Sequence, residues 1–302
     1  MRILLQFPEG LKREALAHAK KLEAEGNEVV ISASPCFGAC DLALDEARRV
    51  GADRIIHFGH AEYGRPDFDV EYVECRIDAP LDVLPLSTGP LGGFARICLL
   101  ATVQHVHQLP EIRRFYEGRG KEVVLNEPTG LTRAPGQLLG CDAGNVADLD
   151  GKVDAFVYFG GGTFHPIAAL LRTTKPFFLV DPFMRKVESV GHLREEHARG
   201  SRGRIVSSLG AKNFGILVST KSGQYRMDLA VRLKAGIEAA GMAAAILVSG
   251  TFDFESLGNL MEFDAFVNTA CPRLAPDDCG RMRKPLLSAD ELAKVLELRK
   301  GT

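Results

Sequence analysis

The segment Phe263-Asp264-Ala265-Phe266-Val267-Asn268-Thr269-Ala270-Cys271-Pro272-Arg273-Leu274 shows the pattern around which the chain is organised. Its apolar start, Phe263 to Val267, predicts a buried strand, and Pro272 ends that strand just past a cysteine. Cys40 and Cys141 occupy similar glycine-marked turns after predicted strands. Because no local motif links three positions so far apart, only a fold that brings separate units together could make them one site.

Strands and helices alternate along the chain in three rounds. Strands are predicted at residues 2–7, 28–33, 54–58, 94–101, 122–125, 155–159, 214–219, 243–248 and 264–268. Helices are predicted at residues 11–25, 41–50, 108–117, 167–171, 192–204, 225–240 and 254–261, the fifth as a solvated linking helix. The alternation indicates α/β units with parallel sheets and helical crossovers. We therefore expect three similar small α/β domains, at residues 1–90, 91–190 and 191–302.

Composition narrows the class of protein. Hydrophobic residues make up 46% and charged residues 25% of the 302 residues, which is typical of a globular protein in water. The net charge of −2 gives no indication of nucleic-acid binding. We find no signal peptide and no apolar run long enough to span a membrane, so a cytoplasmic location is expected. Seven scattered cysteines in such a compartment argue against a disulfide framework.

Three converging thiolates would have two natural uses. A structural zinc site normally has four protein ligands, usually in short-spaced pairs, and this chain has one such pair, Cys36-Phe37-Gly38-Ala39-Cys40. An iron–sulfur cluster also prefers thiolates, and three ligands on a four-iron cluster leave one iron open for a substrate. The common radical-cluster motif, with three closely spaced cysteines, is absent. The residues alone leave both metals open, and each cysteine could also be a small buried hydrophobe.

Two other turns are candidate binding loops. Gly160-Gly161-Gly162-Thr163-Phe164-His165-Pro166 follows a predicted strand and precedes a predicted helix, where backbone and helix start favour an anionic group. Ser219-Thr220-Lys221-Ser222-Gly223-Gln224 has the same position in the third round, and resembles a phosphate loop only loosely. Arg273 could pair with a ligand carboxylate. The alternative for each is structural: a tight turn, a capped helix start, or an internal ion pair.

Five motifs together resemble a known family. They are Leu5-Gln6-Phe7-Pro8-Glu9-Gly10-Leu11, Gly38-Ala39-Cys40-Asp41, Gly136-Gln137-Leu138-Leu139-Gly140-Cys141, Ser219-Thr220-Lys221-Ser222-Gly223-Gln224 and Cys271-Pro272-Arg273-Leu274. They occur in the same order in the archaeal diphthamide synthase family, the 2-(3-amino-3-carboxypropyl)histidine synthases. The resemblance covers nearly the whole chain, and the widely spaced cysteines are its most specific part. The departures are small: Cys36 could compete with Cys40 for metal, and the tail after Leu286 is short.

The resemblance implies three α/β domains around a central [4Fe-4S] cluster whose ligands are Cys40, Cys141 and Cys271. It also implies a homodimer that uses S-adenosylmethionine as substrate and takes an electron from a donor of unknown identity. The aminocarboxypropyl radical formed by cleavage of a C–S bond would add to an imidazole carbon of a histidine in elongation factor 2. The S-adenosylmethionine pocket is expected to include Gly160, Gly161, Gly162, His165, Ser219, Lys221, Gln224 and Arg273.

Two other functions remain to be weighed. Some relatives are built from paired unlike subunits, so a non-catalytic scaffold that bears zinc or a cluster is an alternative function. The complete cysteine triplet favours the catalytic form instead. An ordinary nucleotide-binding enzyme using the Gly160 loop is disfavoured, because the chain lacks the Gly-x-Gly-x-x-Gly fingerprint.

Overall fold

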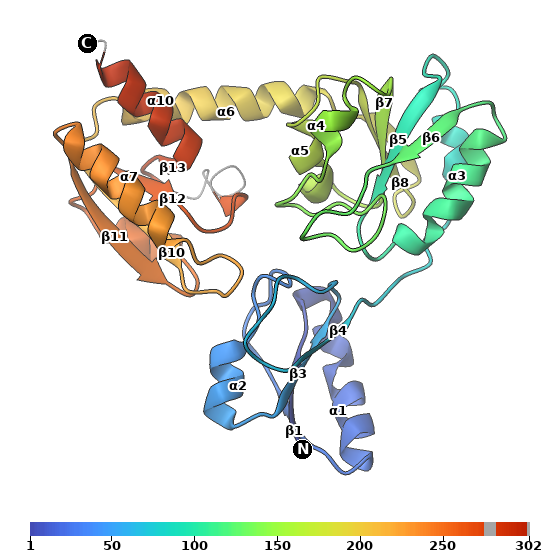
Figure 1. Cartoon of the computed structure of the whole chain (residues 1–302), viewed down its shortest axis with the longest axis horizontal. Coiled ribbons are helices and arrows are strands. Elements are labelled where there is room, and N and C mark those ends of the chain that lie inside the picture. Colours follow the sequence, from blue (N-terminus) through green and yellow to red (C-terminus); the bar gives the residue numbers. More distant parts are fainter. Residues whose placement is uncertain (275–281, 301–302) are drawn as a thin grey trace. The chain divides into compact units, whose positions relative to one another are not determined.

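The computed structural model describes residues 1–274 and 282–300 and has an α/β architecture with three separate sheets (Figure 1). Cys279 lies outside the described residues. The chain divides into two compact units, Met1–Arg194 with two sheets and Glu195–Thr302 with the third. The division into three domains at residues 90 and 190 therefore stays a prediction. Among the described residues, no helix is both long and apolar enough to cross a membrane.

The first sheet has the strand order β2-β1-β3-β4, and all its strands are parallel. Its strands are β1 (Arg2–Gln6), β2 (Glu28–Ile31), β3 (Arg54–Phe58) and β4 (Val70–Val73). Helix α1 (Ala15–Ala24) packs on one face, against Ile3 and Leu5, and α2 (Leu44–Val50) packs on the other, against Leu4. Both faces are covered, and this is why apolar residues are consecutive in β1 (Ile3-Leu4-Leu5) and in β3 (Ile55-Ile56).

The second sheet has the order β6-β5-β7-β8-β9, with an antiparallel edge strand. Its strands are β5 (Arg96–Ala101), β6 (Glu122–Leu125), β7 (Ala155–Phe159), β8 (Phe177–Asp181) and β9 (Lys186–Ser189). Helix α3 (Leu109–Glu117) covers the face of Ile97 and Leu99. Helices α4 (Val146–Leu149) and α5 (Phe164–Leu170) cover the face of Cys98 and Leu100.

The third sheet repeats the order, β11-β10-β12-β13, with all strands parallel. Its strands are β10 (Asn213–Ser219), β11 (Ala243–Ser249), β12 (Ala265–Asn268) and β13 (Leu286–Ser288). Helices α7 (Met227–Ala239) and α10 (Ala289–Lys300) pack on one face, and α8 (Phe254–Gly258) packs on the other. The first four strands of each sheet thus follow one order, and the predicted fold class is confirmed.

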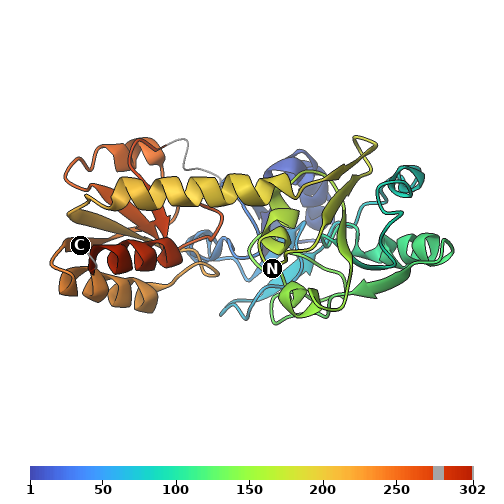
Figure 2. The same cartoon turned by 90° about the horizontal axis from the view of Figure 1, so that it is seen from above.

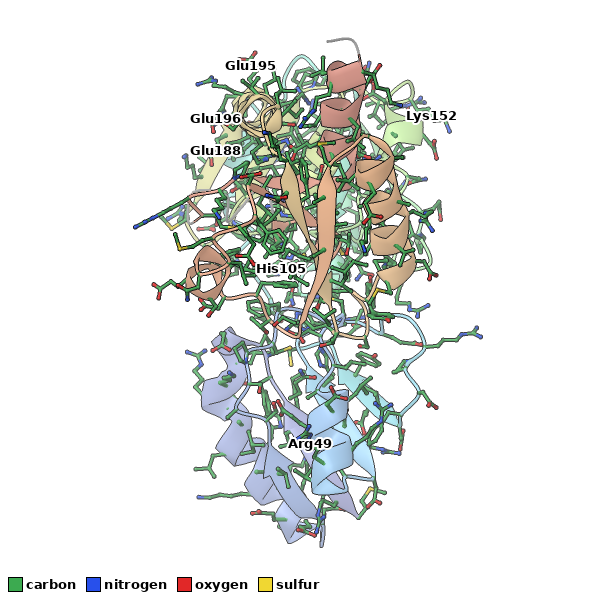
Figure 3. All side chains as sticks on the ribbon, turned by 90° about the vertical axis from the view of Figure 1, so that its left-hand side faces the viewer. Arg49, His105, Lys152, Glu188, Glu195 and Glu196 are labelled. Atoms are coloured by element: carbon green, nitrogen blue, oxygen red, sulfur yellow. The ribbon has the colours of Figure 1, made fainter. Side chains whose placement is uncertain are left out.

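Helix α6 (His192–Ser208) is one continuous helix that runs across the boundary between the two units (Figure 2). Its first turns carry exposed charges, including Glu195 and Glu196 (Figure 3). Only Ile205 and Ser208 are buried. The predicted solvated linking helix is confirmed, and it extends four residues beyond the predicted end.

The structure corrects several predicted boundaries. Helix α1 begins at Ala15 rather than Leu11, because Glu9–Glu14 forms 3-10 turns (η1). A 3-10 turn at Val106–Gln108 (η3) likewise precedes α3. A third, Leu84–Ser87 (η2), and the strands β4, β8, β9 and β13 were not predicted. Strand β9 pairs antiparallel with β8, so this edge departs from the predicted parallel pairing.

Candidate functional site

Cys40 lies in the loop between β2 and α2, beyond the carboxyl ends of the first sheet. The buried side chain of Gln6, the last residue of β1, anchors this loop. Its Nε2 donates to the backbone oxygen of Asp41 at 2.6 Å, and its Oε1 accepts from the backbone N–H of Ala43 at 3.1 Å. The Cys40 turn is therefore fixed to the centre of the sheet on its carboxyl side.

Cys141 follows β6 and occupies the corresponding loop of the second sheet. Gln137 forms a parallel bridge with Ala101, the last residue of β5, which adds a short extension to the sheet. Beyond the bridge, Asp142 closes the turn: its Oδ1 accepts from the N–H of Gly144 at 2.9 Å, and its Oδ2 accepts from the Thr129 hydroxyl at 2.6 Å. The Cys141 side of the loop is exposed.

Cys271 follows β12 in the second unit. Asn268 shapes its turn, since its Oδ1 accepts from the N–H of Ala270 at 2.9 Å and its Nδ2 donates to the oxygen of Cys271 at 2.7 Å. The hydroxyl of Thr269 donates to the oxygen of Leu217 on β10 at 2.8 Å. Pro272 follows the cysteine, and Arg273 is buried.

The six described cysteines differ in accessibility. Cys36 and Cys98 are buried, whereas Cys40 and Cys271 are partly exposed and Cys141 is exposed. Burial raises the pKa of Cys98 to about 12, so this thiol stays protonated and inert. The three cysteines expected at the site thus lie in turns at the carboxyl edges of three sheets, where sites form in parallel α/β folds. Cys40 and Cys141 belong to one compact unit and Cys271 to the other.

The Gly160 loop is a turn between β7 and α5, as expected. Gly162 has a φ of +70°, which only glycine adopts readily, and nothing lies within 4 Å of a Cβ added there. Gly161 is exposed, and a Cβ on it would lie 3.7 Å from Oδ2 of Asp181, the last residue of β8. His165 is half-buried in α5. The loop has open backbone beside one carboxylate.

The loop at 219–224 begins at the end of β10 and leads towards α7. Ser219 is buried, and its hydroxyl accepts from the N–H of Lys221 at 3.2 Å. The N–H of Gln224 donates to the oxygen of Lys221 at 2.9 Å, so the loop is a compact turn. Because this loop and Arg273 belong to the second unit and the Gly160 loop to the first, their membership of one pocket stays a prediction.

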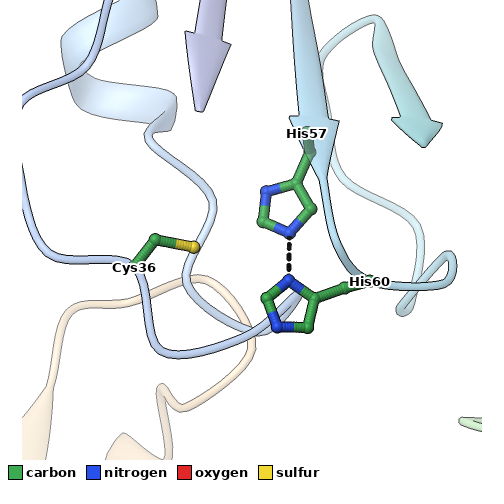
Figure 4. A group of neighbouring side chains, drawn as sticks. All are labelled: Cys36, His57 and His60. Carbon is green, nitrogen blue, oxygen red and sulfur yellow. Dashed lines mark hydrogen bonds between the residues drawn. The ribbon is translucent and has the colours of Figure 1, made fainter. Parts of the chain in front are cut away.

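Sequence reasoning assigned no role to two histidines that lie beside the Cys40 loop. His57, on β3, is fully buried, and its Nε2 lies 2.9 Å from Nδ1 of His60 (Figure 4). Burial lowers the pKa of His57 to about 3, helped by the neighbouring His60. Burial likewise lowers the pKa of His60 to about 4, so both rings are neutral at pH 7. The signal was present as His57-Phe58-Gly59-His60 at a strand end.

A third histidine occupies a comparable place in the second sheet. His105, which is labelled in Figure 3, follows β5. Its Nδ1 lies 3.0 Å from the oxygen of Ile77. Its ring packs against Phe159 and Phe183, with ring centroids 5.8 and 5.7 Å away. Burial lowers its pKa. An aromatic setting and a backbone partner make His105 a structural histidine.

Comparison with known proteins places the chain in a family. Residues 7–302 match the family described as "Putative diphthamide synthesis protein". The chain is 34% identical to the 2-(3-amino-3-carboxypropyl)histidine synthase of Pyrococcus horikoshii, over 99% of this chain and 86% of that protein. It is 30% identical to subunit 1 of the human 2-(3-amino-3-carboxypropyl)histidine synthase, over 98% of this chain and 68% of that protein.

The fold agrees with these matches. A crystal structure of Dph2 from Pyrococcus horikoshii with a 4Fe-4S cluster superposes with a TM-score of 0.91 at 32% identity. The superposition covers 100% of this chain and 87% of that one. A match across the whole length, in sequence and in fold, identifies this chain as a member of the diphthamide synthesis family.

Proposed function

We propose that this chain carries out the first step of diphthamide biosynthesis. It transfers the 3-amino-3-carboxypropyl group of S-adenosylmethionine to an imidazole carbon of a histidine in elongation factor 2. The observation that supports this function best is the match along the whole chain to a 2-(3-amino-3-carboxypropyl)histidine synthase. The fold also superposes on a structure that contains a 4Fe-4S cluster. In this proposal the protein works in the cytoplasm, where translation takes place.

Cys40, Cys141 and Cys271, the cluster cysteines, are the proposed ligands of one [4Fe-4S] cluster. The donor set fits, since thiolates are the ligands that such clusters prefer, and none of these three side chains is buried in a core. When bound, a reduced cluster with one iron open to substrate supplies the electron that cleaves a C–S bond of S-adenosylmethionine. Three protein thiolates on four irons leave that one iron open.

The surrounding residues hold these thiols in place. Gln6 fixes the Cys40 turn, Asp142 closes the Cys141 turn and Asn268 closes the Cys271 turn, each through hydrogen bonds to backbone groups. The turn that carries each cysteine is therefore held by short-range hydrogen bonds beside its own sheet. This rigidity suits a site that must position a reactive intermediate rather than transfer protons through a side chain.

The S-adenosylmethionine site is proposed to include the Gly160–Gly162 loop with His165, and the turn of Ser219, Lys221 and Gln224 with Arg273. Open backbone at Gly161 and Gly162 admits a close ligand, and Asp181 beside Gly161 could accept from an ammonium or hydroxyl group. Lys221 and Arg273 supply positive charge for the substrate carboxylate. We also propose a homodimer and a separate electron donor.

The test is the reaction itself. The anaerobically reconstituted chain is reduced with dithionite and given S-adenosylmethionine and elongation factor 2, and the products are identified by mass spectrometry. We expect methylthioadenosine and one aminocarboxypropyl group on one histidine, with loss of the proton from the imidazole carbon. Release of 5′-deoxyadenosine with an unmodified factor would contradict the proposed bond cleavage.

The human relative is named as one subunit of a synthase, and this name favours a second candidate function. In that alternative the chain is a cluster- or zinc-bearing scaffold that supports another subunit. It predicts that the purified chain, alone with its substrates, forms no adduct although its metal site is filled. The same reaction on the isolated chain therefore distinguishes catalyst from scaffold.

A further inference from the structure

A second group of metal-ligating side chains lies in the first unit, apart from the cluster cysteines. Among the described residues, Cys36, His57 and His60 are the one group of three such residues whose ligand atoms all lie within 4.8 Å of one another (Figure 4). Cys36 and His57 are buried, and His60 is partly buried. We call these three residues the Cys36–His57–His60 cluster.

The fold brings the three residues together at the carboxyl end of the first sheet. His57 lies on β3 directly opposite Gln6 on β1, where the strand order reverses. Gly59 then has a φ of +83°, and a Cβ added there would lie 2.9 Å from Cγ of Pro8. Only glycine fits this tight turn, which returns His60 towards His57. Cys36 comes from the loop after β2.

The hydrogen bonds of Gln6 determine which nitrogen of His57 carries the proton. Nε2 of Gln6 must face the oxygen of Asp41, and Oε1 of Gln6 must face the N–H of Ala43. That same Oε1 lies 2.9 Å from Nδ1 of His57 and can only accept, so Nδ1 carries the proton. Nε2 of His57 therefore presents its lone pair to His60. An outer partner that fixes the tautomer in this way is typical of metal-binding histidines.

We propose that Sγ of Cys36, Nε2 of His57 and Nδ1 of His60 bind one Zn²⁺ ion, or a divalent ion of the same preference. One thiolate and two neutral imidazoles form a donor set that suits tetrahedral zinc. Bonds of about 2.0–2.1 Å to each nitrogen separate the two nitrogens by roughly 3.3 Å, so the 2.9 Å pair needs to open only slightly.

Ion binding is balanced in protons. The ion replaces the hydrogen that Nδ1 of His60 donates to Nε2 of His57, and that hydrogen moves to the other nitrogen of His60. The thiol of Cys36 loses its proton to solvent, so one proton is released for each ion bound. The three protein ligands leave a fourth coordination position for water. The ion would tie the loop that carries Cys40 to strand β3.

The test measures zinc and iron separately in the same full-length protein. The chain is loaded anaerobically with iron and sulfide, incubated with Zn²⁺, desalted and analysed by elemental mass spectrometry. We expect one zinc per chain in addition to the cluster iron. Cys36→Ala, His57→Gln and His60→Gln should each lose the zinc and keep the iron. Their affinity for zinc should fall by more than the roughly 10–100-fold typical when only an outer partner of a ligand is lost.

Two matched controls come from the second sheet. Cys98→Ala removes another buried thiol and His105→Gln another buried imidazole, and both variants should keep zinc and iron alike. Three outcomes would overturn the proposal: no zinc on the wild-type chain, zinc that persists in all three ligand variants, or zinc that is lost when the cluster cysteines are replaced. Loss of iron together with zinc in Cys36→Ala would instead assign Cys36 to the cluster.

A measurement without substitutions covers the case in which the buried variants fail to fold. Nitrogen-15 spectra of the imidazoles report metal binding and tautomer directly. On addition of Zn²⁺ we expect Nε2 of His57 and Nδ1 of His60 to shift, while Nδ1 of His57 keeps its proton and His105 is unchanged. Imidazole signals that do not respond to zinc would refute the site. Neither test uses S-adenosylmethionine or elongation factor 2. Failure of the zinc proposal can therefore be distinguished from failure of the proposed function.

Discussion

Replacing Gln6 by Ala should strongly destabilise the first sheet. Gln6 is 2% exposed and makes three hydrogen bonds, to the oxygen of Asp41, the N–H of Ala43 and Nδ1 of His57. At about 1 kcal/mol net for each bond, the loss is about 3 kcal/mol, and buried groups left unsatisfied raise it to about 3–5 kcal/mol. This is a large part of the 5–15 kcal/mol typical of a domain.

The matched control is Gln108→Ala in η3, the 3-10 turn that precedes α3 beside the second sheet. Gln108 is 8% exposed, and its amide group exchanges a pair of hydrogen bonds with the backbone of Ala79, each 2.9 Å long. We expect a loss of about 2 kcal/mol by the same reasoning, confined to the second sheet. The Cys40 loop should keep its structure in this variant and lose it in Gln6→Ala, because only Gln6 contacts Asp41 and Ala43.

The assay is native-state hydrogen exchange followed by mass spectrometry, peptide by peptide. A loss of 3 kcal/mol corresponds to roughly 150-fold faster exchange of amides that open with the sheet. In Gln6→Ala this acceleration should appear in β1, β3 and the segment after Cys40, and in Gln108→Ala it should appear in the second sheet instead. Iron content should fall only in Gln6→Ala. Acceleration of less than about tenfold in the first sheet would refute the view that Gln6 holds the Cys40 turn.

The other predictions concern the cluster cysteines, the two candidate binding loops and Glu291. Replacing any one cluster cysteine by Ala should remove most of the iron and the activity together. The control, Cys98→Ala, should keep the visible absorption of the cluster. Iron that is lost in only one or two of the three cysteine variants would contradict a shared site. Gln224→Ala and Gly161→Leu should each weaken S-adenosylmethionine binding in calorimetry and leave the iron unchanged; unaltered affinity in both would make the two loops structural turns. Burial would raise the pKa of Glu291, but hydrogen bonds that include Arg204, 2.6 Å away, lower it below its usual value. Its stabilisation of the third sheet is therefore present above about pH 4.5 and is lost as the pH falls below that value, so thermal melts of Glu291→Gln should depend less on pH in this acid range than those of the wild type.

The sequence alone predicted the bounds of three strands in the first two sheets. Residues 54–58, 122–125 and 155–159 form β3, β6 and β7 with the predicted bounds. A strand covered on both faces is a continuous apolar run, and glycines often mark its ends. Strand β9 escaped prediction because Lys186-Val187-Glu188-Ser189 is short and holds a single apolar residue, at a sheet edge. Strand β13 has three residues, too few for a pattern.

The candidate site divides in the same way. The sequence singled out Cys40, Cys141 and Cys271 as candidates, because each cysteine follows a strand in a glycine- or proline-marked turn that can be recognised locally. It did not identify the partnership of Gln6 and His57, which lie 51 residues apart in the chain. Only the parallel register of β1 and β3 places them side by side, and register is set by long-range pairing rather than by local pattern. The candidate cysteines could therefore be recognised from local sequence, whereas the Cys36–His57–His60 cluster was decided by tertiary structure.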